Sequence, residues 1–156
     1  MNIPSTKRKV MSLIYESMLL FGIIFSTCLF YGIVSNQRNA LHHRLGLQIT
    51  VFIVLGLYFI WCWTKSGQTL AMKTWGLQLQ TVNKNPISFT MAIKRYILGW
   101  IYLFLPTVLV YIVFKEVKFI LYVFLINIML NLIYMHFNKN KQMVYDRLLG
   151  LEIVKN

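Results

Sequence analysis

One acidic residue, Glu16, lies inside a long apolar stretch of the sequence, where a carboxylate could do chemistry. The stretch covers residues 10–34, and Glu16 is its only acid. An unpaired carboxylate is costly in hydrocarbon, so it must be protonated, paired or drawn toward the membrane surface. Lys9 shares nearly the same helix face but lies about 10 Å away along the axis, so a direct partner must come from elsewhere. Glu16 is therefore a proton or cation site, half of a structural ion pair, or a carboxylate that reaches the interface.

Two other groups of polar residues interrupt the apolar sequence. Asn127 and Asn131 are four residues apart, which places them on one face of a helix. Polar pairs in mid-membrane usually hold helices together and less often line an ion path. Asp146 and Arg147 are adjacent near the carboxyl end, in a short amphipathic stretch, where such a pair is ordinarily solvated.

Motifs for metal binding and catalysis are missing from the sequence. His42 and His43 are adjacent, so they point apart in regular structure, and Cys28 and Cys62 each lie alone in an apolar run. There is no GxSxG, HExxH, CxxC or phosphate-binding glycine loop. We therefore expect no enzyme activity, no metal and no cofactor.

The composition indicates a membrane protein. Of 156 residues, 58% are hydrophobic and 13% charged, whereas soluble domains are about half apolar and a quarter charged. The net charge of +12 would suggest nucleic acid as the partner of a soluble protein. Here long apolar runs separate the basic residues, which places them beside anionic lipid headgroups. We expect membrane lipids as partners and no nucleic acid.

Four apolar segments predict an all-α membrane fold with four transmembrane helices, at residues 10–34, 45–63, 96–114 and 119–136. The first follows a basic cluster, as in a signal peptide, but it is too long and lacks a cleavage site, so we expect a retained span. The last two form a hairpin because residues 115–118 carry three charges. Pro106 predicts a kink in the third span.

The basic residues predict the orientation. Twelve of the 16 Lys and Arg residues lie in the amino-terminal segment, in the loop 64–95 and in the tail 137–156. The positive-inside rule places these three segments, and so both termini, in the cytoplasm of a bacterial cell. Aromatic residues at the adjoining span ends match an interfacial belt: Trp61, Trp63, Tyr96, Trp100 and Tyr102.

The central loop and the tail share one design. The loop predicts a short interfacial helix ending at Gly76, a strand over 77–82, and a helix N-cap at Ser88. Gln142 and Gly150 have the same spacing as Gln68 and Gly76, and a Gly-Leu-x-[Leu/Ile] sequence follows in both. We predict two parallel copies of a hairpin, an interfacial helix and a short strand, with the two strands paired. Because few positions match, chance similarity is the alternative.

The chain resembles the RDD family of bacterial membrane proteins over nearly its whole length, as a single domain of residues 1–156. Two blocks at span entries, Pro86-Ile87-Ser88 and Lys94-Arg95-Tyr96, add to the likeness. The three main blocks are Arg8-Lys9 with Leu13-Ile14-Tyr15-Glu16, Ser66-Gly67-Gln68-Thr69-Leu70 with Trp75-Gly76-Leu77, and Asp146-Arg147-Leu148-Leu149-Gly150.

This resemblance implies a charged triad of Arg8, Glu16 and Asp146, with Lys9 as a substitute for Arg8. Gln68, Asn127, Asn131 and Arg147 would support that site. The chain departs from the family pattern where Glu16 replaces the first Asp, which keeps the charge but lengthens its reach. Ala71 and Leu149 also replace residues that are usually Gly and Ala.

Two functions are compatible with these features of the sequence. The resemblance implies an inner-membrane protein related to transport, and sodium/proton antiport is claimed for some family members. We expect exchange of a monovalent cation for protons with Glu16 titrating, in a homo-oligomer because four helices make a small path. The alternative is a structural or assembly protein whose charged triad ties helix ends together and whose basic face binds a partner or anionic lipid.

Overall fold

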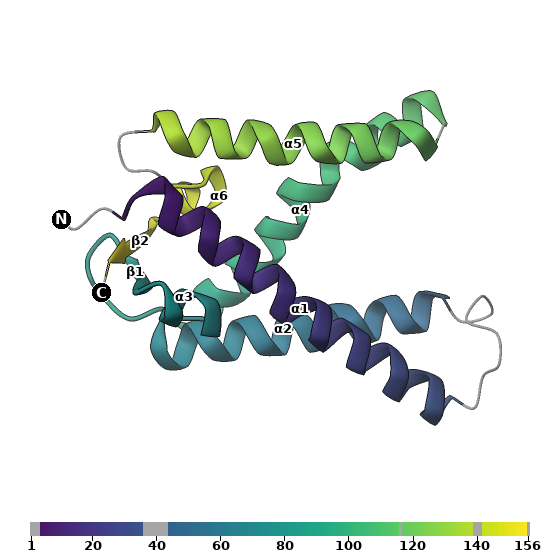
Figure 1. The fold of residues 1–156 in the computed structure, drawn as a ribbon, viewed down its shortest axis with the longest axis horizontal. Coiled ribbons are helices and arrows are strands. Elements are labelled where there is room, and N and C mark those ends of the chain that lie inside the picture. Colours follow the sequence, from purple (N-terminus) through teal and green to yellow (C-terminus); the bar gives the residue numbers. More distant parts are fainter. Residues whose placement is uncertain (1–3, 36–43, 116, 139–141, 156) are drawn as a thin grey trace.

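The computed structural model describes residues 4–35, 44–115, 117–138 and 142–155. Four of its helices are long and apolar enough to cross a membrane, which confirms the all-α membrane fold. They extend the predicted spans mainly toward the basic clusters (Figure 1). The four are α1 (Thr6–Val34), α2 (Arg44–Ser66), α4 (Phe89–Phe114) and α5 (Val117–Phe137).

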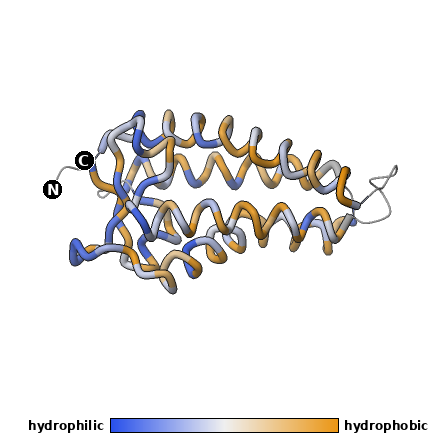
Figure 2. The backbone as a smooth tube through the Cα atoms, turned by 90° about the horizontal axis from the view of Figure 1, so that it is seen from below, coloured by the Kyte–Doolittle hydropathy of each residue, from blue (hydrophilic) through white to orange (hydrophobic). Residues whose placement is uncertain are grey.

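The four short elements lie together at one end of the molecule, beside both termini (Figure 1). We call this the basic end. Polar residues gather there, whereas the long helices are mostly apolar (Figure 2). The predicted short helix and strand of the central loop are both confirmed, although the strand ends at Thr81, one residue earlier than predicted. The short elements are α3 (Leu70–Thr74), β1 (Leu77–Thr81), α6 (Val144–Leu148) and β2 (Leu151–Lys155).

Hydroxyl side chains define where the helices start. Ser88 Oγ accepts a hydrogen bond from the Met91 backbone N–H at 3.3 Å, so the predicted cap of α4 is confirmed. Ser5 caps α1 in the same way. α4 ends where Lys115 adopts a left-handed conformation with φ 53°, at the charged turn predicted from the sequence.

The strand register has the symmetry of two repeats. β1 and β2 are antiparallel, with Leu79 opposite Ile153 and Leu77 opposite Lys155. Leu79 and Ile153 are equivalent positions in the two copies, so the pairing is what a two-fold axis through this residue pair requires. Gly76 and Gly150, also equivalent, have φ of 60° and 64°, a conformation that glycine adopts without steric cost. The shared spacing therefore reflects shared structure.

The hydrophobic core sits at the basic end rather than between the spans. Leu77, Leu79 and Leu151 of the sheet are each no more than 1% exposed, and they pack with residues of α2, α3 and α4. Tyr96 of α4 lies against Gly56 of α2, where an added Cβ would come within 3.1 Å of the ring. Its hydroxyl also donates to the Phe52 carbonyl at 2.7 Å. This contact joins the two hairpins.

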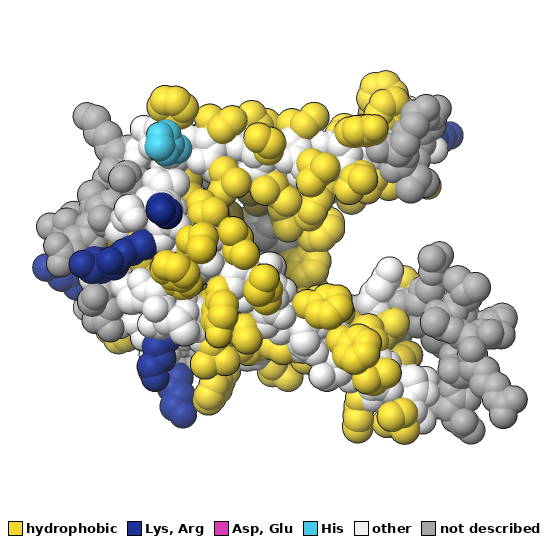
Figure 3. All heavy atoms as spheres, in the orientation of Figure 1, with side chains coloured by type: hydrophobic (Ala, Val, Ile, Leu, Met, Phe, Trp, Pro, Cys, Tyr) yellow, Lys and Arg dark blue, Asp and Glu magenta, His cyan; other side chains and the backbone are white. Residues whose placement is uncertain are grey.

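Away from the basic end, the hairpins α1–α2 and α4–α5 diverge (Figure 1). A hollow lined by hydrophobic side chains separates them (Figure 3). On this face most Lys and Arg side chains gather at the basic end, and no acidic side chain is visible among the described residues (Figure 3). Large apolar side chains such as Phe21 and Ile33 of α1 are more than 70% exposed, as expected for surfaces that meet lipid.

Candidate functional site

The side chain of Glu16 is buried and hydrogen-bonded by two hydroxyl groups. Tyr58 Oη of α2 donates to one carboxylate oxygen, Oε1, at 2.8 Å. Thr69 Oγ1 donates to the other oxygen, Oε2. Glu16 is 8% exposed and Thr69 is 2% exposed. Three elements thus meet at one carboxylate: α1, α2 and the start of α3.

The helix α1 turns its polar residues inward. Its buried residues are Lys9, Ser12 and Glu16, and their spacing of three and four residues places them on one face. This face packs against α3. A helix in lipid hides polar groups and exposes apolar ones, and the first turns of α1 do so at these three positions.

Thr69 has a fixed role at the carboxylate. As the N-cap of α3, its Oγ1 accepts the Met72 backbone N–H at 3.2 Å. Its single hydroxyl proton is therefore directed at Glu16. The Tyr58 hydroxyl both donates and accepts, so it can donate to an ionised Glu16 or accept from a protonated Glu16. The cluster presents two carboxylate and two hydroxyl oxygens, the ligand type that hard cations prefer.

A second buried cluster joins Arg95 of α4 to Asp146 of α6. Arg95 Nε donates to Asp146 Oδ1 at 2.7 Å and Nη2 donates to Oδ2 at 3.2 Å. The side chains are 8% and 1% exposed. Two parallel hydrogen bonds make this a bidentate ion pair, the strongest form of the interaction.

Aromatic rings enclose this ion pair. The Arg95 Cζ lies 4.1 Å from the centroid of the Trp63 ring of α2 and 5.7 Å from that of Tyr145, within the range of a cation–π contact. Burial raises the pKa of the Tyr145 phenol well above its ordinary value, and the charge of Asp146 raises it further. Tyr145 is therefore neutral at physiological pH, and the pair stays electrically balanced.

The predicted triad of Arg8, Glu16 and Asp146 is brought together only in part, because Glu16 and Asp146 both act electrostatically on Arg95, a residue outside the triad. Arg8 is exposed, whereas its neighbour Lys9 is 3% exposed. Asp146 instead pairs with Arg95, which sequence reasoning did not include in the site. The signal was present, because Arg95 occupies the position in the third span that Arg8 occupies in the first.

Asn127 and Asn131 of α5 replace a backbone hydrogen bond that Pro106 removes from α4. A proline has no N–H, so the carbonyl of Tyr102, four residues earlier in α4, loses its helical partner. Asn127 Nδ2 of α5 donates to that carbonyl at 3.4 Å, and Asn131 Nδ2 donates to Asn127 Oδ1 at 2.7 Å. α4 changes direction along its length (Figure 1). The pair ties α5 to the proline site; a role in an ion path stays a prediction.

The remaining predicted residues lie outside both clusters. Gln68 is partly exposed just before α3, and Arg147 is exposed and donates to Tyr134 Oη at 3.4 Å. His42 and His43 lie outside the described residues. Within the described residues, no three His, Cys, Asp or Glu side chains are grouped as metal ligands.

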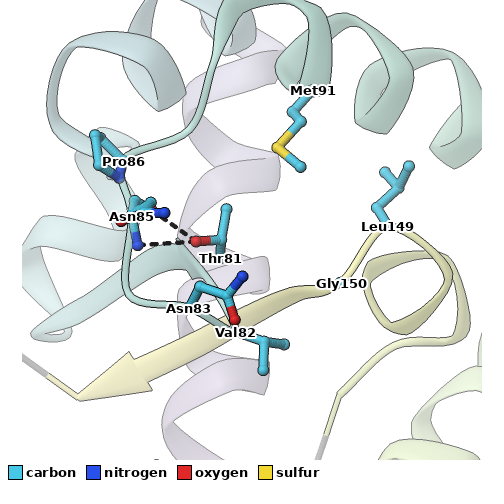
Figure 4. Close-up of a pocket in the computed structure, with 8 residues that line it drawn as sticks. All are labelled: Thr81, Val82, Asn83, Asn85, Pro86, Met91, Leu149 and Gly150. Carbon is cyan, nitrogen blue, oxygen red and sulfur yellow. Dashed lines mark hydrogen bonds between the residues drawn. The ribbon is translucent and has the colours of Figure 1, made fainter.

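A surface pocket lies between the loop after β1 and the end of α6 (Figure 4). Met91 and Leu149 give it an apolar wall. Its polar groups are already paired, because Thr81 Oγ1 accepts the Asn85 N–H at 2.9 Å and donates to the Asn85 carbonyl at 3.0 Å. We assign it no chemistry.

Removing one partner of the Arg95–Asp146 pair should cost far more than removing both. Asp146→Leu leaves a buried guanidinium charge uncompensated, so we expect a loss of about 3–5 kcal/mol in the free energy of unfolding. The double variant Arg95→Met/Asp146→Leu should recover most of that loss. Detergent-driven unfolding of the purified protein measures each value. Additive effects of the two substitutions would contradict a direct pair.

The Asn127 contact should matter only while residue 106 is proline. Asn127→Leu leaves the Tyr102 carbonyl unsatisfied, so we expect a loss of about 1–2 kcal/mol in the free energy of unfolding. In a Pro106→Ala background the restored N–H satisfies that carbonyl, and Asn127→Leu should cost much less. The same unfolding assay tests the cycle. Equal costs in the two backgrounds would show that Asn127 stabilises the helices in another way.

Comparison with known proteins agrees with this architecture. Searches of the curated proteins and of the solved structures found no match to the chain. The model of the RDD family matches residues 4–150, a range that includes Glu16, both buried clusters and all four spans. The chain is therefore a multi-pass membrane protein that belongs to the RDD family.

Proposed function

We propose that this RDD protein exchanges a monovalent cation for protons across the inner membrane of a bacterial cell. The observation that carries the proposal is the environment of Glu16, a buried carboxylate in a membrane-spanning helix that accepts hydrogen bonds from Tyr58 and Thr69. Ionisable residues in membrane spans are rare and are by default functional. No enzymatic reaction is part of the proposal.

The exchange follows from the charge of the carboxylate. Ionised Glu16 attracts a cation, and its oxygens and the two hydroxyl oxygens supply hard ligands. Protonation of Glu16 removes the charge that holds the cation. One proton then leaves as one cation enters, and the rotatable hydroxyl of Tyr58 serves either state by donating to or accepting from the carboxyl group.

A homo-oligomer is part of the proposal. The hairpins diverge away from the basic end, and the hollow between them has apolar walls (Figures 1 and 3). Among the residues that the structure describes, a single copy thus offers no polar path along this hollow. In a homo-oligomer, a second copy would pack against the apolar surface that a single copy exposes to lipid. The path would then be enclosed between the copies.

Glu16→Gln should abolish cation-dependent proton flux. The amide keeps the size of the side chain but neither carries charge nor titrates near neutral pH. We expect flux in vesicles of purified protein, driven by Na⁺, K⁺ or Li⁺ gradients, to fall to the level of protein-free vesicles. Glu152→Gln is the matched control, because Glu152 is buried in β2 and bonded to Gln80 outside the spans.

Unchanged flux in Glu16→Gln would end this mechanism. Tyr58→Phe tests whether the Tyr58 hydroxyl is a ligand of the cation. Loss of one oxygen ligand should raise the cation concentration for half-maximal flux by about fivefold. An unchanged concentration would remove Tyr58 from the cation site.

A second candidate is an assembly protein without transport. The observation that favours it is the Arg95–Asp146 pair, which is saturated by its own hydrogen bonds and links α4 to α6. On this proposal the buried charges serve architecture, and vesicles show no cation-dependent flux. Glu16→Gln would then lower the amount of folded protein in the membrane instead of a transport rate.

We further propose that the basic end faces the cytoplasm. The described basic residues at this end include Lys7, Lys65 and Lys84, which favours it by the positive-inside rule. Lys115→Cys, at the opposite end of α4, should react with a membrane-impermeant maleimide on intact cells. Lys155→Cys should react only after permeabilisation. The unmodified chain controls for labelling of Cys28 and Cys62, and the reverse pattern would overturn this orientation.

A further inference from the structure

A polar pocket of about 310 Å³ lies where α2 ends, between β1 and the loop that leads into α4. We infer that it binds a phosphate-bearing anion at the membrane surface. Neither the exchange mechanism nor the buried clusters use this pocket. The residues that carry the argument all line it: Trp63, Lys65, Gly67, Gln78, Lys84 and Asn85.

Charge favours an anion in this pocket. Lys65 and Lys84 approach it from different segments, and no Asp or Glu is among the residues that line it. The nearest acid in its hydrogen-bond network is Glu152, which is occupied by the Gln80 amide at 2.7 Å. Two lysines on separate segments can place ammonium donors on two sides of one phosphate.

A buried donor without a partner points the same way. The Trp63 indole Nε1 is buried and has no hydrogen-bond partner among the residues the structure describes. Trp63 is 6% exposed, so water reaches little of it. An unpaired buried N–H is costly, and Trp63 is one of the residues that line the pocket. An indole can only donate, which excludes a cation as the partner of this group.

The carboxyl end of a helix normally repels anions, because its last carbonyls are unpaired. Two of the last carbonyls of α2, and the carbonyl of the residue that follows the helix, accept hydrogen bonds within the protein. The Trp63 carbonyl accepts the Gly67 N–H at 3.0 Å, and the Ser66 carbonyl accepts Gln78 Nε2 at 3.5 Å. The Gly67 carbonyl accepts the Leu79 N–H at 2.8 Å. The unfavourable dipole is thereby reduced beside the two lysines.

The loop that carries Lys84 is held in place before any ligand binds. Lys84 N donates to the Thr81 carbonyl at 2.8 Å. The next residue, Asn85, forms two hydrogen bonds with Thr81 Oγ1, drawn as dashed lines in Figure 4. A fixed loop loses little entropy on binding.

The pocket lies at the level of the membrane surface. Lys65 is in the last turn of the spanning helix α2, and its Nζ lies 4.8 Å from the centre of the Trp61 ring. Trp and Lys side chains at span ends lie among lipid headgroups. The ligand chemistry is a phosphate mono- or diester, which a phospholipid headgroup or a soluble phosphate can supply.

The test compares two doubly substituted proteins with the same net charge. Lys65→Gln/Lys84→Gln removes both pocket lysines, whereas Lys73→Gln/Lys155→Gln removes two exposed lysines that do not line the pocket. Binding of short-chain phosphatidylglycerol to each protein in neutral detergent is measured by native mass spectrometry. We expect the pocket variant to bind about tenfold or more weakly than the unsubstituted protein, and the control to bind nearly as well.

Inorganic phosphate and glycerol phosphate identify the source of the ligand. If neither displaces the short-chain lipid at matched concentration, the pocket takes a lipid headgroup. If either binds, and the pocket variant loses that binding, the pocket takes a soluble phosphate. Equal losses in the two double variants, or no loss in either, would overturn the proposal, provided that circular dichroism shows both to be folded.

Discussion

Lipid offers no hydrogen bonds, and this constraint shapes every polar contact of the structure. Each polar side chain in a spanning helix must find its partner inside the protein. Glu16 finds Tyr58 and Thr69, Arg95 finds Asp146, and Asn127 finds the carbonyl that Pro106 leaves open. The short helices at the basic end supply two of these partners. Thr69, which caps α3, bonds to Glu16 of α1, and Asp146 of α6 pairs with Arg95 of α4.

The two repeats solve this problem with the same architecture and different chemistry. In both, the first helix of the hairpin is joined by a buried polar contact to the short helix of its own repeat: Glu16 to Thr69, and Arg95 to Asp146. The residue types are not shared, because Glu16 corresponds to Leu103 and Asp146 to Met72. The first contact joins a carboxylate to hydroxyl groups. The second is a bidentate ion pair in which each charge compensates the other.

Sequence patterns predicted the fold well because its determinants are local. Apolar length fixed the four spans, charge fixed the break near Lys115, and the alternation after Gly76 predicted β1. The matched spacing of Gly76 and Gly150 predicted that the two strands pair, and the structure shows that their register is two-fold. The site was harder. Its partners are 42 to 53 residues apart, and nothing in the local pattern at Tyr58, Thr69 or Arg95 says which carboxylate each one meets.

The hydrophobic core lies at one end of the molecule, so the two ends are held together by different contacts. Packing is dense at the basic end, where the sheet, Tyr96 and Trp63 lock α2 against α4. Toward the other end the hairpins separate (Figure 1), and α4 is interrupted at Pro106, where a side chain of α5 replaces a helical hydrogen bond. At Pro106 the path of α4 therefore depends on a contact with α5, whereas at the basic end it is held by the sheet and the core. Glu16, on α1 and bonded to α2 and α3, lies in the packed part of the molecule, away from the helix that Pro106 interrupts.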